Sequence, residues 1–192
     1  MAEYTINNSP VHSDTILTGV YGQTGSSWAT CGFHTGTDFA PTGTTPSINA
    51  PLYSVCSGEV VQVRTESALG NVIVIKETNS NRYWRFCHMN SSSPLSVGDT
   101  VTTSTIVGYM GQTGTGAHGV HLHLECATTL VWQCATFLNC SQQLNIPNVS
   151  GTVVHYDGST PPTPPVPPTP SEKSNLKKWG WFMSTKKVRI NL

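Results

Sequence analysis

The chain has 192 residues, with ten basic and ten acidic side chains that make up only 10% of the sequence. This length allows one ordinary domain with its own core and excludes a second large domain. The low charge, together with many Gly, Thr, Ser and Val residues, disfavours long solvated helices and favours short strands joined by tight turns. No segment approaches the roughly 18 apolar residues that a membrane-spanning helix requires. We therefore expect an all-β body.

The N-terminus and the cysteines bear on where the chain is made. Residues 1–5 lack the basic region and the apolar stretch of a secretory signal, so we expect synthesis in a host cytoplasm and exit by another route. Six cysteines match no familiar disulfide or zinc-finger spacing, and up to three disulfides are compatible with them. Cys87 lies in an apolar run, where a free thiol acts as a small hydrophobe. We therefore favour buried free cysteines over a full disulfide set.

Strand-like runs separated by turn residues cover much of the body. β-Branched, aromatic and apolar residues gather in runs at 59–63, 72–75, 83–87, 106–110 and 120–126. A loop punctuated by Gly111, Gly114, Gly116 and Gly119 precedes the last run. This pattern predicts a compact antiparallel sheet with long loops on one side.

The composition changes near Gly158. Residues 160–170 consist of proline, threonine and valine, which cannot join a sheet ladder and favour a stiff polyproline II spacer. We therefore expect one domain at 1–158, a Pro/Thr-rich linker at 159–172 and a basic-aromatic tail at 173–192.

The tail is basic and the body is acidic. Six of the ten basic residues follow residue 170 with one acidic residue, which leaves four basic and nine acidic residues upstream. Trp179, Trp181 and Phe182 are interleaved with these cations. Two interpretations stay open: a solvated tail without a partner, or a segment that binds an anionic wall polymer or a membrane surface. We do not expect nucleic acid as its partner.

Two short stretches far apart in the chain carry the candidate chemistry. Residues 34–38 read HTGTD and residues 121–123 read HLH, which together supply three imidazoles and a carboxylate. This is more than a hydrolytic zinc site with one open coordination position needs. Each motif alone also fits ordinary surface histidines.

The spacing within each stretch decides whether its side chains can share a metal. Alternate residues of a strand share a face, so His121 and His123 project side by side while Leu122 goes to the other face. His34 and Asp38 reach one metal only if the backbone bends between them, and Gly36 permits this bend.

Further stretches occur in a recognisable order along the chain. They read HTGTD at 34–38, INAP at 48–51, SGEVV at 57–61, FCHM at 86–89, VGDTV at 97–101 and GVHLHLE at 119–125. Over about residues 18–138 the chain resembles the lysostaphin-like (LytM-type) zinc endopeptidases. The resemblance implies an antiparallel β-sheet core of the lysostaphin/LytM (duplicated hybrid motif) type, with loops that form a substrate groove over a zinc site.

The resemblance also implies roles for individual residues. His34, Asp38 and His123 would bind one zinc ion, and His88 and His121 would be the catalytic histidines. Members of the family cut peptide bonds in the stems or cross-bridges of bacterial peptidoglycan. Three protein ligands leave zinc a position for water, whose pKa the metal lowers to about 7. One histidine would take the proton of the attacking water, and the other would stabilise the oxyanion or protonate the leaving amine. The sequence does not assign these two roles between His88 and His121.

The chain departs from the family pattern at residues 83–87, YWRFC, and at Val120, where proline is frequent. Neither change removes a ligand. Near the predicted site, we expect His118 in a loop and do not expect Cys31 to compete for the metal. Glu125 either orients a histidine from behind or ends the strand in solvent.

Two histidines and two aromatic residues lie outside the matched stretches. We expect His12 and His155 to be ordinary packing or surface residues. Tyr21 and Trp28 lie in the Gly/Ser-rich stretch before His34, where a loop would form a wall of the groove.

These observations favour a peptidoglycan hydrolase, a monomeric zinc endopeptidase that acts on peptidoglycan peptides without a covalent intermediate. The absent signal, the spacer and the cationic tail favour a bacteriophage endolysin released by a holin, or a virion-associated lysin, with an exported bacteriocin as a further option. The alternative is a non-catalytic wall-binding or regulatory relative of the same fold. A biotinyl or lipoyl carrier barrel is disfavoured, because the only lysine of the body, Lys76, ends an apolar strand.

Overall fold

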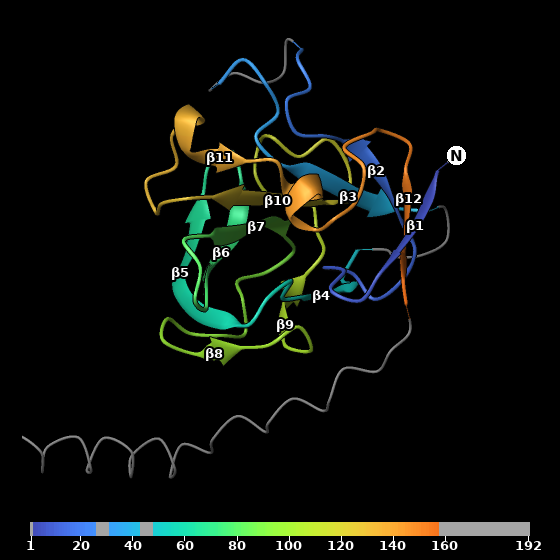
Figure 1. Ribbon diagram of the computed structural model, residues 1–192. Coiled ribbons are helices and arrows are strands. Elements are labelled where there is room, and N and C mark those ends of the chain that lie inside the picture. The colour runs from blue at the N-terminus through green and yellow to red at the C-terminus, as the bar shows by residue number, and fades with distance from the viewer. Residues whose placement is uncertain (1, 26–30, 43–47, 158–192) are drawn as a thin grey trace, which may run out of the picture.

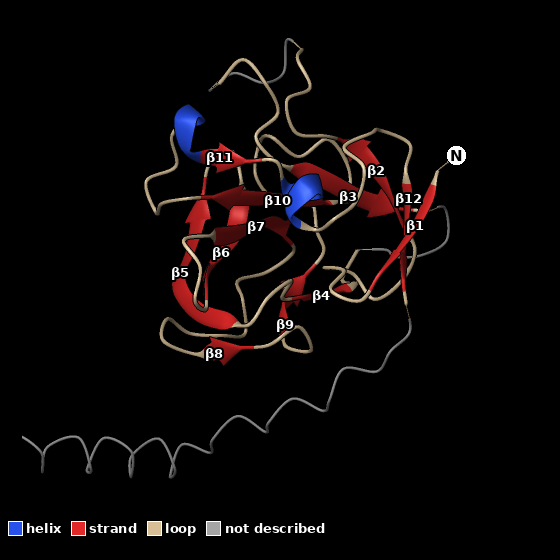
Figure 2. Cartoon of the chain, in the orientation of Figure 1, coloured by secondary structure: helices blue, strands red, loops and turns tan. Residues whose placement is uncertain are grey.

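The computed structural model describes residues 2–25, 31–42 and 48–157, and nearly all of their regular structure is β-strand (Figures 1 and 2). The strands are β1 Glu3–Ile6, β2 Thr15–Gly19, β3 Thr37–Pro41, β4 Pro51–Tyr53, β5 Gly58–Glu66, β6 Gly70–Glu77, β7 Tyr83–Met89, β8 Thr100–Val101, β9 Ile106–Tyr109, β10 Leu122–Ala127, β11 Phe137–Leu138 and β12 Val153–Tyr156. Two short helical elements, η1 Cys134–Thr136 and α1 Cys140–Gln143, follow β10. The all-β prediction is confirmed. Within the described ranges, no helix has the length and apolar character to cross a membrane.

Ten of these strands form one twisted sheet in the order β1-β12-β2-β3-β10-β7-β6-β5-β8, with β11 added to β10. Strands β4 and β9 form a separate two-stranded sheet. Neighbouring strands pair antiparallel throughout, except β1 and β12, which run parallel at one edge. The expected antiparallel sheet is therefore present, and the parallel edge pair was not expected.

Strand β10 lies in the middle of the large sheet, between β3 and β7 (Figure 1). Leu122 and Leu124 are fully buried in the main core, together with Phe39 of β3 and Phe86 of β7. The intervening residues of β10 face the other side of the sheet, as the alternation predicts. Along β10, one face therefore contributes to the main core and the other carries His123 and Glu125. A second, smaller apolar cluster contains Val72, Val74 and Cys87.

Each predicted strand run corresponds to an observed strand, but one of these strands belongs to the small sheet and another begins later than predicted. The runs at 59–63, 72–75 and 83–87 lie within β5, β6 and β7, which pair in succession. The run at 106–110 corresponds to β9, which belongs to the small sheet. Strand β10 begins later than predicted, because His121 makes only an isolated bridge to Gly111.

The cysteines divide into two groups. Cys31 and Cys134 form a disulfide across 103 residues of chain, so the expectation of free cysteines is wrong for this pair. The other four are free and buried: Cys56, Cys87, Cys126 and Cys140. The linker predicted at 159–172 and the tail predicted at 173–192 lie outside the described residues.

Candidate active site

His34, Asp38 and His123 converge where β3 pairs with β10. Nε2 of His34 lies 3.0 Å from Nδ1 of His123 and 3.2 Å from Oδ1 of Asp38. Nδ1 of His123 lies 2.8 Å from the same Asp38 oxygen. One donor atom from each residue lies within 4.8 Å of the others, and all three residues are buried. The structure thus brings the three predicted ligands together.

Strand register and two glycines make this convergence possible. Asp38 and His123 are direct partners across the β3–β10 pair. A Cβ on Gly36 would lie 2.4 Å from the carbonyl oxygen of Leu124 and 2.8 Å from Cε1 of His123. A Cβ on Gly19 would lie 2.3 Å from Oδ2 of Asp38. Both positions therefore need glycine for close approach, and the sequence motifs pointed only to Gly36.

Both candidate histidine ligands have a partner behind the ring. Nδ1 of His34 donates to the carbonyl oxygen of Val20 at 3.2 Å, which leaves its Nε2 directed at Asp38. Nε2 of His123 lies 3.1 Å from Oε1 of Glu125. Partners of this kind fix the ring orientation and tautomer of metal-binding histidines. Two oriented imidazoles and one carboxylate suit a zinc ion with one open position.

The charges of the cluster are strongly coupled. Burial alone would raise the pKa of Asp38, but its hydrogen bonds with His123 and His34 hold that pKa well below its ordinary value. Burial alone would lower the pKa of His123, but hydrogen bonds to Asp38 and Glu125 raise it to about 10. Without a metal the cluster therefore retains a proton, which a metal ion must displace.

His88 and His121 lie beside this cluster, with their ring centroids 4.9 Å apart. Nδ1 of His88 donates to the carbonyl oxygen of Thr113 at 2.8 Å, and Nδ1 of His121 donates to that of Gly119 at 2.9 Å. In the neutral form of either ring, this hydrogen bond leaves Nε2 as the unprotonated acceptor. Burial and the nearby His123 lower the pKa of His88 to about 4, so this imidazole is neutral near pH 7.

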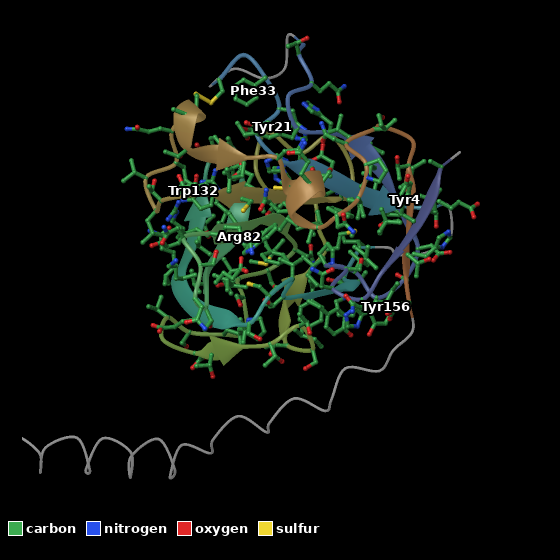
Figure 3. All side chains as sticks on the ribbon, in the orientation of Figure 1. Tyr4, Tyr21, Phe33, Arg82, Trp132 and Tyr156 are labelled. Carbon is green, nitrogen blue, oxygen red and sulfur yellow. A yellow bond between two sulfur atoms is a disulfide. The ribbon has the colours of Figure 1, made fainter. Side chains whose placement is uncertain are left out.

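A cavity of about 440 Å³ opens over the histidines. Phe33 and His118 are among the residues that line it. Tyr21 packs its ring edge-on against Phe33, with centroids 5.6 Å apart, and so supports this wall from behind (Figure 3). Trp28 lies outside the described residues. The loops therefore form a groove over the candidate metal cluster.

The structure decides two alternatives left open by the sequence. Glu125 is only 1% exposed and contacts His123, so the interpretation as a solvent-facing strand end is wrong. Cys31 lines the cavity, but its sulfur is bonded to Cys134 and is no thiolate ligand. Arg85, which pairs with Glu125, and Thr35 were not singled out from the sequence, because their contacts depend on the register of distant strands.

The remaining histidines lie away from the cluster. His12 is stacked between the rings of Tyr53 and Tyr156. His155 of β12, the strand next to the edge strand β1, is partly exposed, and its Nδ1 lies 2.8 Å from Oδ1 of Asp14. Both have the packing and surface positions expected from the sequence.

Comparison with known proteins identifies the family. Residues 32–132, just over half of the chain, match the model of peptidase family M23. The chain belongs to peptidase family M23. The matched residues include all five predicted site residues of this M23 chain.

Individual relatives agree with this assignment. The M23 chain is 39% identical over 92 residues to the peptidoglycan DD-endopeptidase ShyB of Vibrio cholerae, a match that covers 48% of this chain and 20% of that protein. It therefore spans about a fifth of the length of this curated relative. A zinc-containing peptidase from Vibrio cholerae has a similar structure, with a TM-score of 0.57 and 28% identity over 74% of this chain and 40% of that one.

The lysostaphin-like fold is confirmed by a further structure. The catalytic domain of the antimicrobial peptidase lysostaphin from Staphylococcus simulans matches with a TM-score of 0.58 and 24% identity, over 68% of this chain and 92% of that domain.

Proposed function

We propose that this M23 peptidase is a zinc-dependent endopeptidase that hydrolyses peptide bonds in the stems or cross-bridges of bacterial peptidoglycan. The observation that carries the proposal is the convergence of His34, Asp38 and His123 under a groove that also holds His88 and His121. The peptidoglycan endopeptidase and the zinc-containing peptidase among its relatives support the substrate and the metal. The complete donor set argues against a non-catalytic relative that has lost its ligands.

His34, Asp38 and His123 would hold the metal. A zinc ion there would polarise the scissile carbonyl and lower the pKa of a bound water to about 7. His88 and His121 both line the cavity, and their Nδ1 atoms are engaged by backbone carbonyls. One imidazole would accept the proton of the attacking water at Nε2. The other would stabilise the oxyanion or deliver a proton to the leaving amine only as an imidazolium, which carries a proton on Nε2 as well as on Nδ1.

Digestion of purified peptidoglycans with known cross-bridges tests the proposal. The zinc-loaded protein should release peptides with new amino termini, which mass spectrometry identifies, and the chelated protein should release none. If folded, zinc-loaded protein produced no new amino terminus from any of these substrates, the proposed function would be wrong.

The tail carries a separate proposal. Its cations and tryptophans favour binding to an anionic wall polymer or membrane surface. Replacing Lys177, Lys178, Lys186 and Lys187 by glutamate should reduce co-sedimentation with cell walls while leaving hydrolysis of a soluble peptide unchanged. Equal co-sedimentation of variant and parent would contradict it. The bacteriophage origin and holin-type release stay predictions from the sequence.

A further inference from the structure

A buried ion pair lies directly behind the candidate metal cluster. Glu125 of β10 and Arg85 of β7 are partners across the sheet, and they are 1% and 5% exposed. Arg85 donates through Nε and Nη2 to Oε2 of Glu125. Burying two charges costs free energy unless their remaining hydrogen-bonding groups are also satisfied. The partners of the second carboxylate oxygen therefore indicate what the pair does.

The second oxygen of Glu125 is turned toward the metal cluster. Oε1 accepts a hydrogen bond from Oγ1 of Thr35 at 2.5 Å and lies 3.1 Å from Nε2 of His123. Asp38 occupies the other side of the same ring, 2.8 Å from Nδ1. His123 is thus held between two carboxylates, one at each ring nitrogen.

Arg85 is itself fixed by contacts that do not involve Glu125. Its guanidinium carbon lies 4.0 Å from the ring centroid of Trp132, and Nη1 lies 3.6 Å from Oε1 of Glu66. A stacked, planar guanidinium with two donors on one carboxylate oxygen leaves that carboxylate little freedom to turn. The orientation of Glu125 is therefore set by the sheet and, through Arg85, by Trp132.

We propose that Glu125, anchored by Arg85, is a positioning residue of the metal centre. It accepts a hydrogen bond from Nε2–H of His123 and so presents the unprotonated Nδ1 to the metal ion. This inference rests on the proposed zinc site and deepens it. Carboxylates behind metal-binding histidines raise the basicity of the ligand and fix its tautomer, and their loss typically weakens metal binding about 10- to 100-fold.

Zinc affinity of the apo protein, measured by competition with a chelator, tests the proposal without relying on activity. Glu125→Ala should weaken zinc binding about 10- to 100-fold. Glu125→Gln should lose less, because the amide oxygen still accepts from His123. The matched control is Glu77→Gln, which removes the carboxylate paired with Arg82 on the same sheet and should bind zinc as the parent does.

A second measurement needs no substitution. Long-range ¹H–¹⁵N correlation spectra of the zinc-loaded parent should show the proton of His123 on Nε2. This readout keeps the proposal testable if Glu125→Ala fails to fold. A proton on Nδ1, with Nε2 bound to zinc, would overturn it.

The outcomes separate this inference from the proposed function. A folded parent that binds no zinc overturns both. A parent that binds zinc while Glu125→Ala binds it equally well, even with a lower melting temperature, overturns only the positioning role, because Glu125 would then be purely structural.

Discussion

Asp38 and His123 are direct partners across strands β3 and β10, and Nδ1 of His123 lies 2.8 Å from Oδ1 of Asp38. Strand register therefore makes neighbours of two residues that are 85 positions apart in the sequence. A register shift of one residue would turn His123 into the core and a leucine into the cluster. The candidate metal centre depends on this pairing as much as on the identity of its side chains.

Removal of a predicted ligand should abolish both metal binding and hydrolysis. We expect His34→Ala and Asp38→Ala to retain little zinc, because a catalytic zinc site needs three protein ligands and each variant leaves only two. Atomic absorption of the purified variants and hydrolysis of peptidoglycan measure the two effects. The control is His155→Ala on β12, three strands away from β10 in the sheet order. Parent-like lysis by either ligand variant would contradict the assignment.

Removal of a predicted catalytic histidine should abolish hydrolysis without abolishing metal binding. His88→Ala and His121→Ala should keep their zinc and lose about 10²- to 10⁴-fold in kcat, the usual range for a lost general acid or base. His118→Ala, which also removes an imidazole from the cavity wall, should change KM more than kcat. Loss of zinc from His88→Ala would show that His88 contributes to metal binding, which contradicts its assignment as a catalytic histidine.

A single added methyl group at Gly36 should disrupt the cluster. In Gly36→Ala the new Cβ would meet a backbone oxygen of β10 at 2.4 Å, and that oxygen cannot move without disturbing the strand. We expect a loss of about 1–3 kcal/mol in the free energy of unfolding, typical of overpacking, together with weaker zinc binding. Gly98→Ala is the control, because its Cβ meets no atom within 4 Å although its φ of +92° is strained. It should lower stability while zinc affinity stays unchanged.

The Cys31–Cys134 disulfide should stabilise the fold and the groove wall. It closes a loop of 103 residues, for which the chain-entropy model gives about 4.7 kcal/mol and measured disulfides commonly give 2–4 kcal/mol. A double replacement, Cys31→Ser with Cys134→Ser, should lower Tm and raise KM, because Cys31 lines the cavity. Reductant should lower Tm of the parent only. If reductant lowered the Tm of the double variant by the same amount, the Cys31–Cys134 disulfide would not be the source of the stabilisation.

His12 should contribute to acid sensitivity. Burial between Tyr53 and Tyr156 lowers the pKa of His12 to about 4, against the opposing charge of Asp157. The unfolded chain, with a histidine pKa near 6.5, therefore binds more protons between about pH 6.5 and 4. Stability should fall as the pH drops through this window, by at most about 1.4 kcal/mol per pH unit from this residue.

The variant His12→Phe isolates that contribution. It should flatten the decline in unfolding free energy between pH 6.5 and 4, measured by denaturant titration at each pH. Asn81→Ala, in a distant turn, serves as a control and should keep the slope of the parent. An unchanged slope in His12→Phe would exclude His12 as its source.

The fold class and the two candidate stretches, HTGTD and HLH, follow from local patterns, whereas the choice of His34, Asp38 and His123 as ligands came from the resemblance to known peptidases. Alternation along residues 121–125 places His121 and His123 on one face. Gly36 lies between His34 and Asp38 in the HTGTD motif and indicates a bend there. Resemblance to known peptidases added His88, which no spacing connects to the others.

The other features depend on which distant segments become neighbours. The contact of Arg85 with Glu125 requires the β7–β10 register, and the disulfide requires two loops to meet. The close approach of Gly19 to Asp38 follows from the β2–β3 pairing, with its irregularity between Leu17 and Gly19. Sequence periodicity describes one segment at a time and does not contain this information.

The parallel pairing of β1 with β12 has a consequence for how this domain joins other modules. Both strands lie at one margin of the large sheet, and three strands separate β1 from β10 (Figure 1). Any polypeptide attached before β1 or after β12 is thus tethered to the rim of the scaffold. A fusion partner at either side would therefore join the domain away from the β3–β10 pair, where the candidate metal cluster lies.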